Sequence, residues 1–162
     1  MNGIERVVRL LQVPRRNYAT AITRNSYRNR GNLYSDKGVA MRCVRPDQSS
    51  ITVTLHYLNN GNSTMKFVCR KQEFLLPVVV VLKALAPLSD KEIYERIVCH
   101  DHNNSFLTTR LEILLRDAKQ YNCTTCEQYR AYLGSLFRQY LPIDESFSDV
   151  SAGQTLINKF FS

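Results

Sequence analysis

Two short stretches of the sequence hold residue types that could bind a metal ion. The stretch CTTC at 123–126 has the cysteine spacing of half a structural zinc site. No second cysteine pair stands at a useful separation, and Thr124 is better placed to begin a helix. The stretch CHDH at 99–102 offers four possible ligands, but adjacent residues in a loop point in different directions. The sequence therefore predicts that neither stretch binds a metal and that 99–102 is a polar loop between helices.

Nucleophilic catalysis would need a cysteine or serine partnered by a histidine. The three histidines, His56, His100 and His102, have no such motif near them. The phosphate-binding patterns GxGxxG and GxxxxGK followed by Ser or Thr do not occur in the sequence. We therefore expect no catalytic residue and no cofactor-binding residue. A small hydrolase using His100 or His102 is the weakest of the hypotheses kept open.

Basic residues are concentrated at the start of the chain. The first 45 residues contain ten lysines and arginines and two carboxylates, so they account for the whole formal charge of +8. Nine of the ten are arginine, whose planar guanidinium pairs bidentately with phosphate or carboxylate groups. The composition therefore favours specific docking to phosphate or carboxylate groups over a merely solvated basic edge, and it leaves the choice between these two kinds of partner open.

Five arginines in the polar stretch that follows Pro14 are the predicted contacts to nucleic acid or to another protein. Arg6 and Arg9 are excluded from the DNA contacts because they lie in a predicted strand. The predicted contact residues are Arg15, Arg16, Arg24, Arg28 and Arg30.

The N-terminal half of the chain carries the signals of β-strands. Residues 4–13 are rich in Val, Leu and Ile and precede Pro14, which indicates a strand that ends there. Residues 15–37 lack a sustained period and are expected to form a loop. Strand structure is predicted to begin again at 39–43. The stretch ITVTLHYL at 51–58 then alternates between two faces, as a strand does.

A hairpin is predicted directly after this strand. The stretch NNGN at 59–62 contains an Asn-Gly pair, which readily supplies the positive φ values of a tight turn. The stretch TMKFVCR at 64–70 should therefore return antiparallel and bury Met65, Phe67 and Cys69.

The hydrophobic period becomes helical after Pro77, a residue that suits the first turn of a helix. The stretch VVVVLKAL at 78–85 is predicted to be a short buried helix because it lies between two prolines. Ser89 and Glu92 form a capping box that begins a second helix. Apolar residues then recur at helical spacing between 107 and 118.

A second capping box, Thr124 with Glu127, is predicted to begin a helix whose aromatic and leucine stripe at 129–140 packs in the core. Pro142 is expected to end that helix. The stretch AGQTLINKFFS at 152–162 begins another helix. Its apolar residues are expected to need a surface outside this sequence, as in a fragment of a longer chain: Leu156, Ile157, Phe160 and Phe161.

Together these elements predict an α+β fold. Antiparallel strands with a hairpin in the N-terminal half should pack with a cluster of four to five helices in the C-terminal half. A chain of 162 residues is enough for one domain with a real core. We expect a strand and arm at 1–20, a β region at 38–76 and a helical region at 77–162.

The cysteine content and the hydropathy pattern indicate an intracellular protein. The five cysteines are an odd number, and no secretory leader precedes them. The longest apolar run, at 78–85, is too short to span a bilayer. We therefore expect a reduced compartment, cytoplasmic or nuclear, and no membrane association.

Long stretches of the sequence resemble a known family. NGIERVVRLLQVPRRNYATAI at 2–22 resembles the second-largest subunits of multisubunit RNA polymerases, and its PRRN looks like the RNA polymerase I version. The resemblance continues in order and spacing through three further stretches, so it covers most of the chain. These stretches are GVAMRCVRPDQSSITVTLHYLNNGN, FLLPVVVVLKALAPLSDKEIYERI and SFLTTRLEILLRDA.

The resemblance implies a noncatalytic lobe module, a fragment of a much longer subunit of a nucleotidyltransferase that works in the nucleus and nucleolus. In that family the magnesium and zinc sites of the complete enzyme lie outside this segment. The lobe lines the downstream DNA cleft and docks the largest subunit, a small zinc-ribbon subunit and a TFIIF-like heterodimer. An independent basic nucleic-acid-binding domain is the alternative hypothesis.

Overall fold

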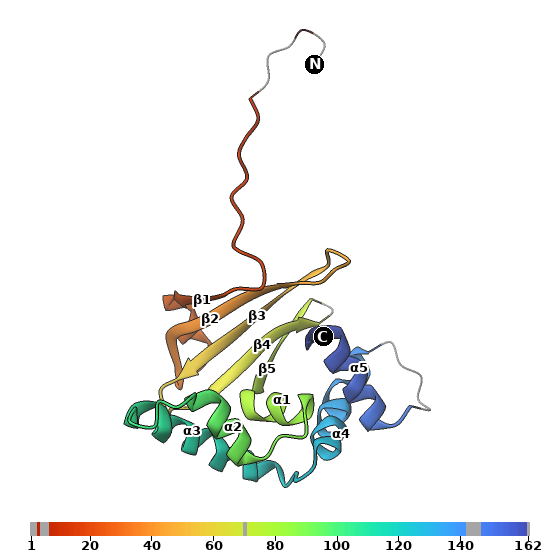
Figure 1. Ribbon diagram of the computed structural model, residues 1–162. Helices are drawn as coiled ribbons and strands as arrows, with labels where there is room; N and C mark the ends of the chain where they lie inside the picture. Colours follow the sequence, from red (N-terminus) through yellow and green to blue (C-terminus); the bar gives the residue numbers. More distant parts are fainter. Residues whose placement is uncertain (1–2, 4–6, 70, 142–146, 162) are drawn as a thin grey trace.

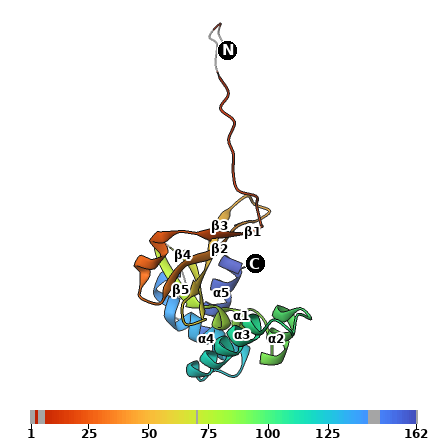
Figure 2. The same ribbon diagram turned by 90° about the vertical axis from the view of Figure 1, so that its left-hand side faces the viewer.

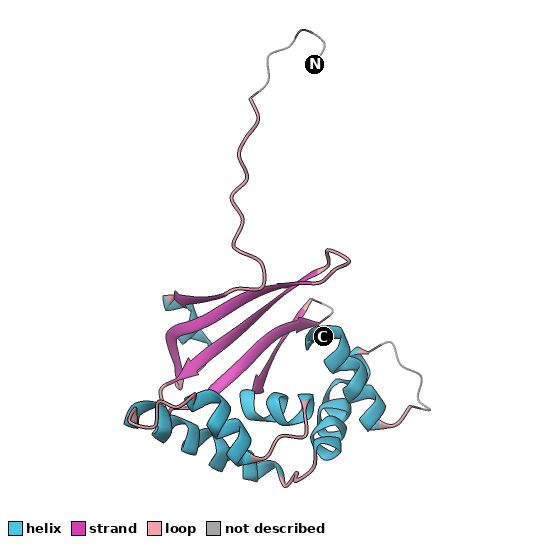
Figure 3. Ribbon diagram, viewed as in Figure 1, coloured by secondary structure: helices cyan, strands magenta, loops and turns pink. Residues whose placement is uncertain are grey.

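The computed structural model describes residues 3, 7–69, 71–141 and 147–161. A twisted antiparallel sheet is formed by the first half of the described chain, and the helices follow it and pack against it (Figures 1 and 3). The structure thus has the predicted α+β class, with its strands before its main helices.

The sheet has five strands in the order β1-β2-β3-β4-β5, and each pairs antiparallel with the next. The register pairs Leu55 with Met65 and Val39, so these side chains share the face that turns toward the helices. His56 and its neighbours on adjacent strands lie on the opposite face. The strands are β1 (Ala19–Thr23), β2 (Tyr34–Val44), β3 (Ser50–Leu58), β4 (Ser63–Cys69) and β5 (Gln72–Pro77).

The predicted hairpin is present between β3 and β4. Gly61 has a φ of 91°, and the Leu58 amide donates to the carbonyl of Asn62 at 2.9 Å, which closes the turn. As predicted, Phe67 and Cys69 on the returning strand are buried, whereas Met65 is only half-buried. The Asn-Gly pair therefore predicted the β3–β4 hairpin correctly.

Two predictions for the first 37 residues are wrong. Residues 7–13 form no strand because no other segment of the described chain pairs with them, and Val7 is 98% exposed; residues 4–6 of that predicted strand lie outside the described residues. Residues 7–14, called the arm here, stand away from the body in both views (Figures 1 and 2). Residues 15–37 are not a loop, since they contain β1, the 3₁₀ helix η1 (Asn25–Arg30) and the start of β2. The strand β5 was not predicted.

The C-terminal half contains the predicted helical cluster. The described residues of this half form the α-helices α1 (Val78–Leu85), α2 (Asp90–Val98), α3 (Ser105–Ala118), α4 (Cys126–Phe137) and α5 (Asp149–Phe161), with the 3₁₀ turns η2 (Lys119–Tyr121) and η3 (Arg138–Tyr140). The capping box of Ser89 and Glu92 is confirmed at the start of α2. The box predicted at Thr124 and Glu127 is wrong by one position, because Thr125 and Gln128 form it.

The core lies between the helix-side face of β4 and β5 and the helices α1, α4 and α5. Phe67 lies at its centre, with its ring centroid 4.9 Å from that of Phe160. Leu156 and Ile157 are also buried there. The expectation that the apolar side of the last helix needs a surface outside this sequence is therefore wrong for these three residues, because β4 and α4 cover them. The side chain of Phe161, the fourth residue of that expectation, lies outside what the structure describes.

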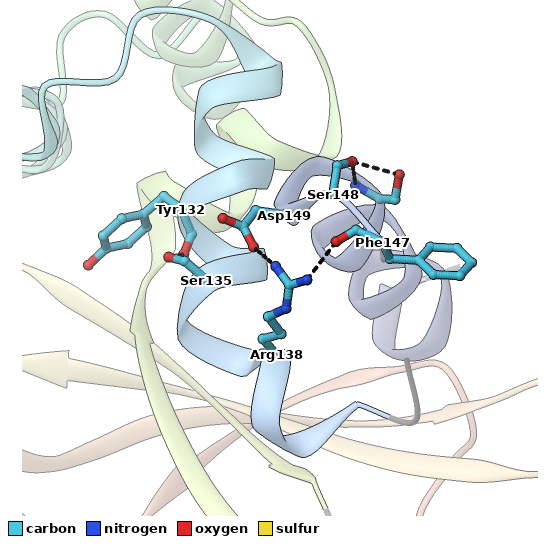
Figure 4. A network of polar contacts seen from close by, with 7 residues as sticks. Tyr132, Ser135, Arg138, Phe147, Ser148 and Asp149 are labelled. Carbon is cyan, nitrogen blue, oxygen red and sulfur yellow. Dashed lines mark hydrogen bonds and ion pairs between the residues drawn. The ribbon is translucent and has the colours of Figure 1, made fainter. Parts of the chain in front are cut away.

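Helix α5 is fixed to the end of α4 by a polar network (Figure 4). The Arg138 guanidinium donates to Asp149 Oδ1 at 2.7 Å and to the carbonyl oxygen of Phe147 at 2.8 Å. Ser148 accepts a hydrogen bond from the Ser151 amide at 3.3 Å, which satisfies one free donor at the start of α5. Pro142, the predicted helix terminator, lies outside the described residues.

Candidate nucleic-acid interface

The five predicted contact arginines lie in two separate groups. Arg15 and Arg16 precede β1, whereas Arg24, Arg28 and Arg30 follow it. A strand of five residues spans about 17 Å. The structure therefore does not bring the five side chains together at one site.

The first group is held at the arm root, defined here as residues 15–18. The Asn17 amide donates to the carbonyl of Arg42 at 2.8 Å. The Asn17 side chain also donates to the Val44 carbonyl at 3.1 Å and accepts from the Val44 amide at 2.7 Å. These three hydrogen bonds fix the arm root to the end of β2, so its arginines have a defined position even though the arm itself stands away from the body.

The arginines of the arm root have uncharged partners. Arg16 donates to the Gln48 side-chain oxygen at 2.9 Å, and the Arg15 guanidinium lies over the Tyr18 ring, 4.9 Å from its centroid. Within the described part of the chain, neither forms an ion pair with a carboxylate. Both positive charges are therefore available to an external anion.

Two more arginines lie beside the arm root, and the sequence analysis did not select them. Arg42 is on β2, and its guanidinium makes a long contact, 3.5 Å, with the Ser50 hydroxyl. Arg45 donates to the carbonyl oxygens of Asn158, at 3.2 Å, and Lys159 at the C-terminal end of α5, where the helix dipole is negative. They lie beside the arm root because Asn17 forms hydrogen bonds with Arg42 and Val44. A local sequence pattern cannot predict this pairing, because the residues are far apart in the chain.

Asp47 is the acidic residue in the turn between β2 and β3, next to this group. The hydroxyl and the amide of Ser49 donate to its Oδ1 at 2.6 and 2.9 Å. These hydrogen bonds, more than the nearby Arg45, lower the pKa of the Asp47 carboxyl. Asp47 therefore serves to shape the turn between β2 and β3.

Two of the three arginines in the second group form ion pairs within the fold. Arg28 pairs with Asp36 at 3.1 Å, and Arg30 pairs with Glu73 on β5 at 2.9 Å. Lys66 pairs with the same Glu73 carboxylate. The pKa of Glu73 is lowered mainly by the hydrogen bond from Lys66. The hydrogen bond from Arg30 is the next largest cause that lowers it.

Arg24 lies beside this second group, at the end of β1. Its amide donates to the carbonyl of Asp36 at 2.7 Å, and its exposed side chain forms no ion pair with any described residue. Arg24 is thus the one predicted contact after β1 that has no carboxylate partner among the described residues.

His56 is completely buried beneath η1 on the face opposite the helices. Its ring packs edge-on against Tyr27 and Tyr34, with centroid distances of 4.5 and 5.8 Å. Burial, followed by the positive charges of Arg30 and Lys66, lowers the pKa of His56 to about 4. Since neither ring nitrogen has a hydrogen-bond partner among the described residues, His56 is a packed core residue in this arrangement and is not positioned as a catalytic base.

Comparisons with known proteins identify the family. The family described as RNA polymerase Rpb2, domain 2, matches residues 15–159. A protein of Schizosaccharomyces pombe described as a probable DNA-directed RNA polymerase I subunit RPA2 is 50% identical over 159 residues. The chain belongs to the RNA polymerase Rpb2 domain 2 family. The human DNA-directed RNA polymerase I subunit RPA2 is 37% identical over 159 residues, and that of Dictyostelium discoideum 46% over 160.

The match to the Rpb2 domain 2 family begins at the arm root and runs into α5, so it includes both arginine groups. The alignments cover 98% of this chain with the yeast and human relatives and 99% with the Dictyostelium one. The chain spans about 14% of the length of each of these three relatives. Among the described residues, no helix combines the length and the apolar character needed to cross a bilayer.

The candidate metal-binding stretches of this Rpb2 domain are separated in the structure. Cys123 donates to the carbonyl of Tyr121 at 3.2 Å, and Cys126 donates to that of Ala84 at 3.4 Å. Cys99 ends α2 in a left-handed conformation, and His102 stacks on Tyr94 with a centroid distance of 6.5 Å. In the described part of the chain, no three His, Cys, Asp or Glu side chains converge as a metal site would require.

We expect chelation to leave the stability of the protein unchanged, because the mixed core of sheet and helices supports the fold without metal ligands. Thermal unfolding with and without EDTA should give the same midpoint. Zinc in stoichiometric amount in tag-free protein, lost together with the fold in Cys123→Ala, would contradict this expectation.

Proposed function

We propose that this protein is a noncatalytic lobe module of the second-largest subunit of RNA polymerase I. The observation that carries the proposal is the alignment of nearly the whole chain with proteins named as RNA polymerase I subunits. The module lines the downstream DNA cleft of the polymerase and docks other subunits during ribosomal RNA synthesis. Its location is nuclear and, more narrowly, nucleolar.

The chemistry of the described residues supports a positional role. His56 has no access to solvent, and Cys99 and His100 are exposed residues of the turn that follows α2. We propose that the nucleotidyltransferase reaction belongs to the complete enzyme, whose magnesium and zinc are held elsewhere, as the resemblance to the family implies. The proposed partners are the largest subunit, small subunits including a zinc-ribbon protein and a TFIIF-like heterodimer, and downstream DNA.

Co-purification is the direct test of this proposal. The full-length subunit that contains this sequence should carry an affinity tag at its native locus, and the associated proteins should be identified. We expect the largest polymerase subunit and template-dependent RNA synthesis in the same fraction. Recovery of the tagged protein without any polymerase subunit would contradict the proposal and favour an independent nucleic-acid-binding domain.

The isolated 162-residue protein should have no nucleotidyltransferase activity of its own, because it presents no phosphate-binding loop of the known patterns. A primed-template assay with labelled nucleotides should give no product above background, while the complete enzyme gives product under the same conditions. Template-dependent synthesis by the isolated protein, abolished by a substitution within it, would refute the noncatalytic role.

A further inference from the structure

We infer that the nucleic-acid contact of this domain is a small surface at the arm root, formed by Arg15, Arg16 and Arg42, and that Arg28 and Arg30 instead form ion pairs within the protein. The inference deepens the proposed function, which supplies DNA as the partner. It replaces the five residues expected from the sequence with a set that includes a β2 residue.

The arm-root surface is preorganised for an anion. The hydrogen bonds of Asn17 hold residues 15 and 16 beside β2, and the Tyr18 ring supports the Arg15 guanidinium from below. Tyr18 is itself 53% exposed. Guanidiniums already held in place lose less conformational entropy when they bind, so a phosphate meets donors at a fixed position.

The arm-root surface differs from the second arginine group in whether its positive charges are paired with carboxylates. Arg28 and Arg30 are paired with the carboxylates of Asp36 and Glu73, and Arg30 is more buried than Arg28. Those ion pairs hold η1 over the face that contains His56. Among the described residues, the guanidiniums of Arg15, Arg16 and Arg42 contact an aromatic ring, an amide and a hydroxyl but no carboxylate, which leaves their charge to attract a polyanion.

A nucleic-acid backbone fits these features better than a protein partner does. Contacts to phosphates need exposed cations in a row and derive their strength from counterion release, so they do not require a buried apolar anchor. Arg15, Arg16 and Tyr18 are exposed, and Arg42 is half-buried. We therefore assign this surface to sequence-independent contact with the phosphates of duplex DNA.

The test is titration of the protein into a short fluorescent duplex of mixed sequence, followed by anisotropy between about 50 and 200 mM salt. We expect weak binding of the wild type, with a Kd of about 10⁻⁴ to 10⁻⁶ M near physiological salt. Combining Arg15→Ala, Arg16→Ala and Arg42→Gln should flatten the plot of log K against log salt by about two to three units. At low salt the affinity should fall at least about tenfold.

A matched control removes the same charge elsewhere. Arg96, Arg116 and Lys119 are exposed residues of α2, α3 and η2, and their combined replacement by alanine should leave the salt slope close to that of the wild type. Thermal unfolding of both variants verifies folding. If Arg42→Gln disturbs the sheet, the pair Arg15→Ala and Arg16→Ala alone should flatten the slope by about two units.

Equal losses of duplex affinity in the arm-root and control variants would overturn the inference, because the net charge of the protein alone would then explain binding. An unchanged slope in the arm-root variant would overturn it as well, and loss of polymerase subunits from that variant would identify a protein-docking surface instead. The proposed function is tested separately by co-purification. The chain can bind duplex DNA through the arm root and still fail to co-purify with the largest subunit. It can also co-purify with that subunit and fail to bind duplex DNA through the arm root.

Discussion

Replacing Gly134 with alanine is expected to destabilise the protein by about 3 kcal/mol, which corresponds to roughly 10 °C in the unfolding midpoint. A β-carbon at this position would lie 2.7 Å from the Asp149 carbonyl carbon and 2.9 Å from the Gly153 nitrogen. Both are backbone atoms, which cannot rotate away, so α4 and α5 would have to separate. In an isolated helix, replacing glycine with alanine would stabilise the helix by about 1 kcal/mol. The close contact between α4 and α5 therefore turns a stabilising substitution into a destabilising one.

The reciprocal substitution, Gly153→Ala, should destabilise comparably, because its β-carbon would lie 2.7 Å from the Arg130 carbonyl carbon. Ser135→Ala is the matched control, since Ser135 is the next residue on α4 and is exposed. Chemical denaturation of the three variants beside the wild type measures the differences. A Gly134→Ala protein as stable as the Ser135→Ala protein would show that the two helices can move apart at no cost.

The protein should lose stability as the pH falls from about 6.5 to about 4, by at most about 3 kcal/mol from His56 alone. The folded state holds the pKa of His56 at about 4, below the ordinary value of 6.5. In this window the unfolded chain binds a proton that the folded chain does not bind, so acid favours unfolding. The stabilisation is fully present above pH 6.5 and is lost as the pH approaches the folded value.

The charged groups that act on His56 are Arg30 and Lys66, which lower its pKa, and Glu73, which raises it. In His56→Gln, the free energy of unfolding should vary less between pH 6.5 and pH 4 than in the wild type, whatever the absolute stability of the variant. His100→Gln is the control, because His100 is exposed. Equal pH dependence in His56→Gln and the wild type would mean that folding does not change the pKa of the histidine.

Local chemistry in the sequence determined the class of fold and much of its order. The Asn-Gly pair at residues 60 and 61 fixed a hairpin because few residues adopt the positive φ of such a turn. Ser89 with Glu92 fixed the start of α2 through a reciprocal pair of hydrogen bonds. Each of these signals lies within four residues of sequence, so it is legible without any knowledge of the tertiary structure. The concentration of arginine in the first 45 residues is equally a property of the sequence alone.

Only the tertiary structure decided which arginines share a surface. Arg30 meets Glu73 across 43 residues, and Asn17 meets Val44 across 27. The same long-range pairing made residues 15–37 part of the sheet, buried His56 under η1 and left residues 7–13 without a partner strand. The physical reason is that strand register and helix crossing depend on the simultaneous packing of distant segments. A guanidinium therefore becomes an internal ion pair or an exposed contact according to what the fold places beside it.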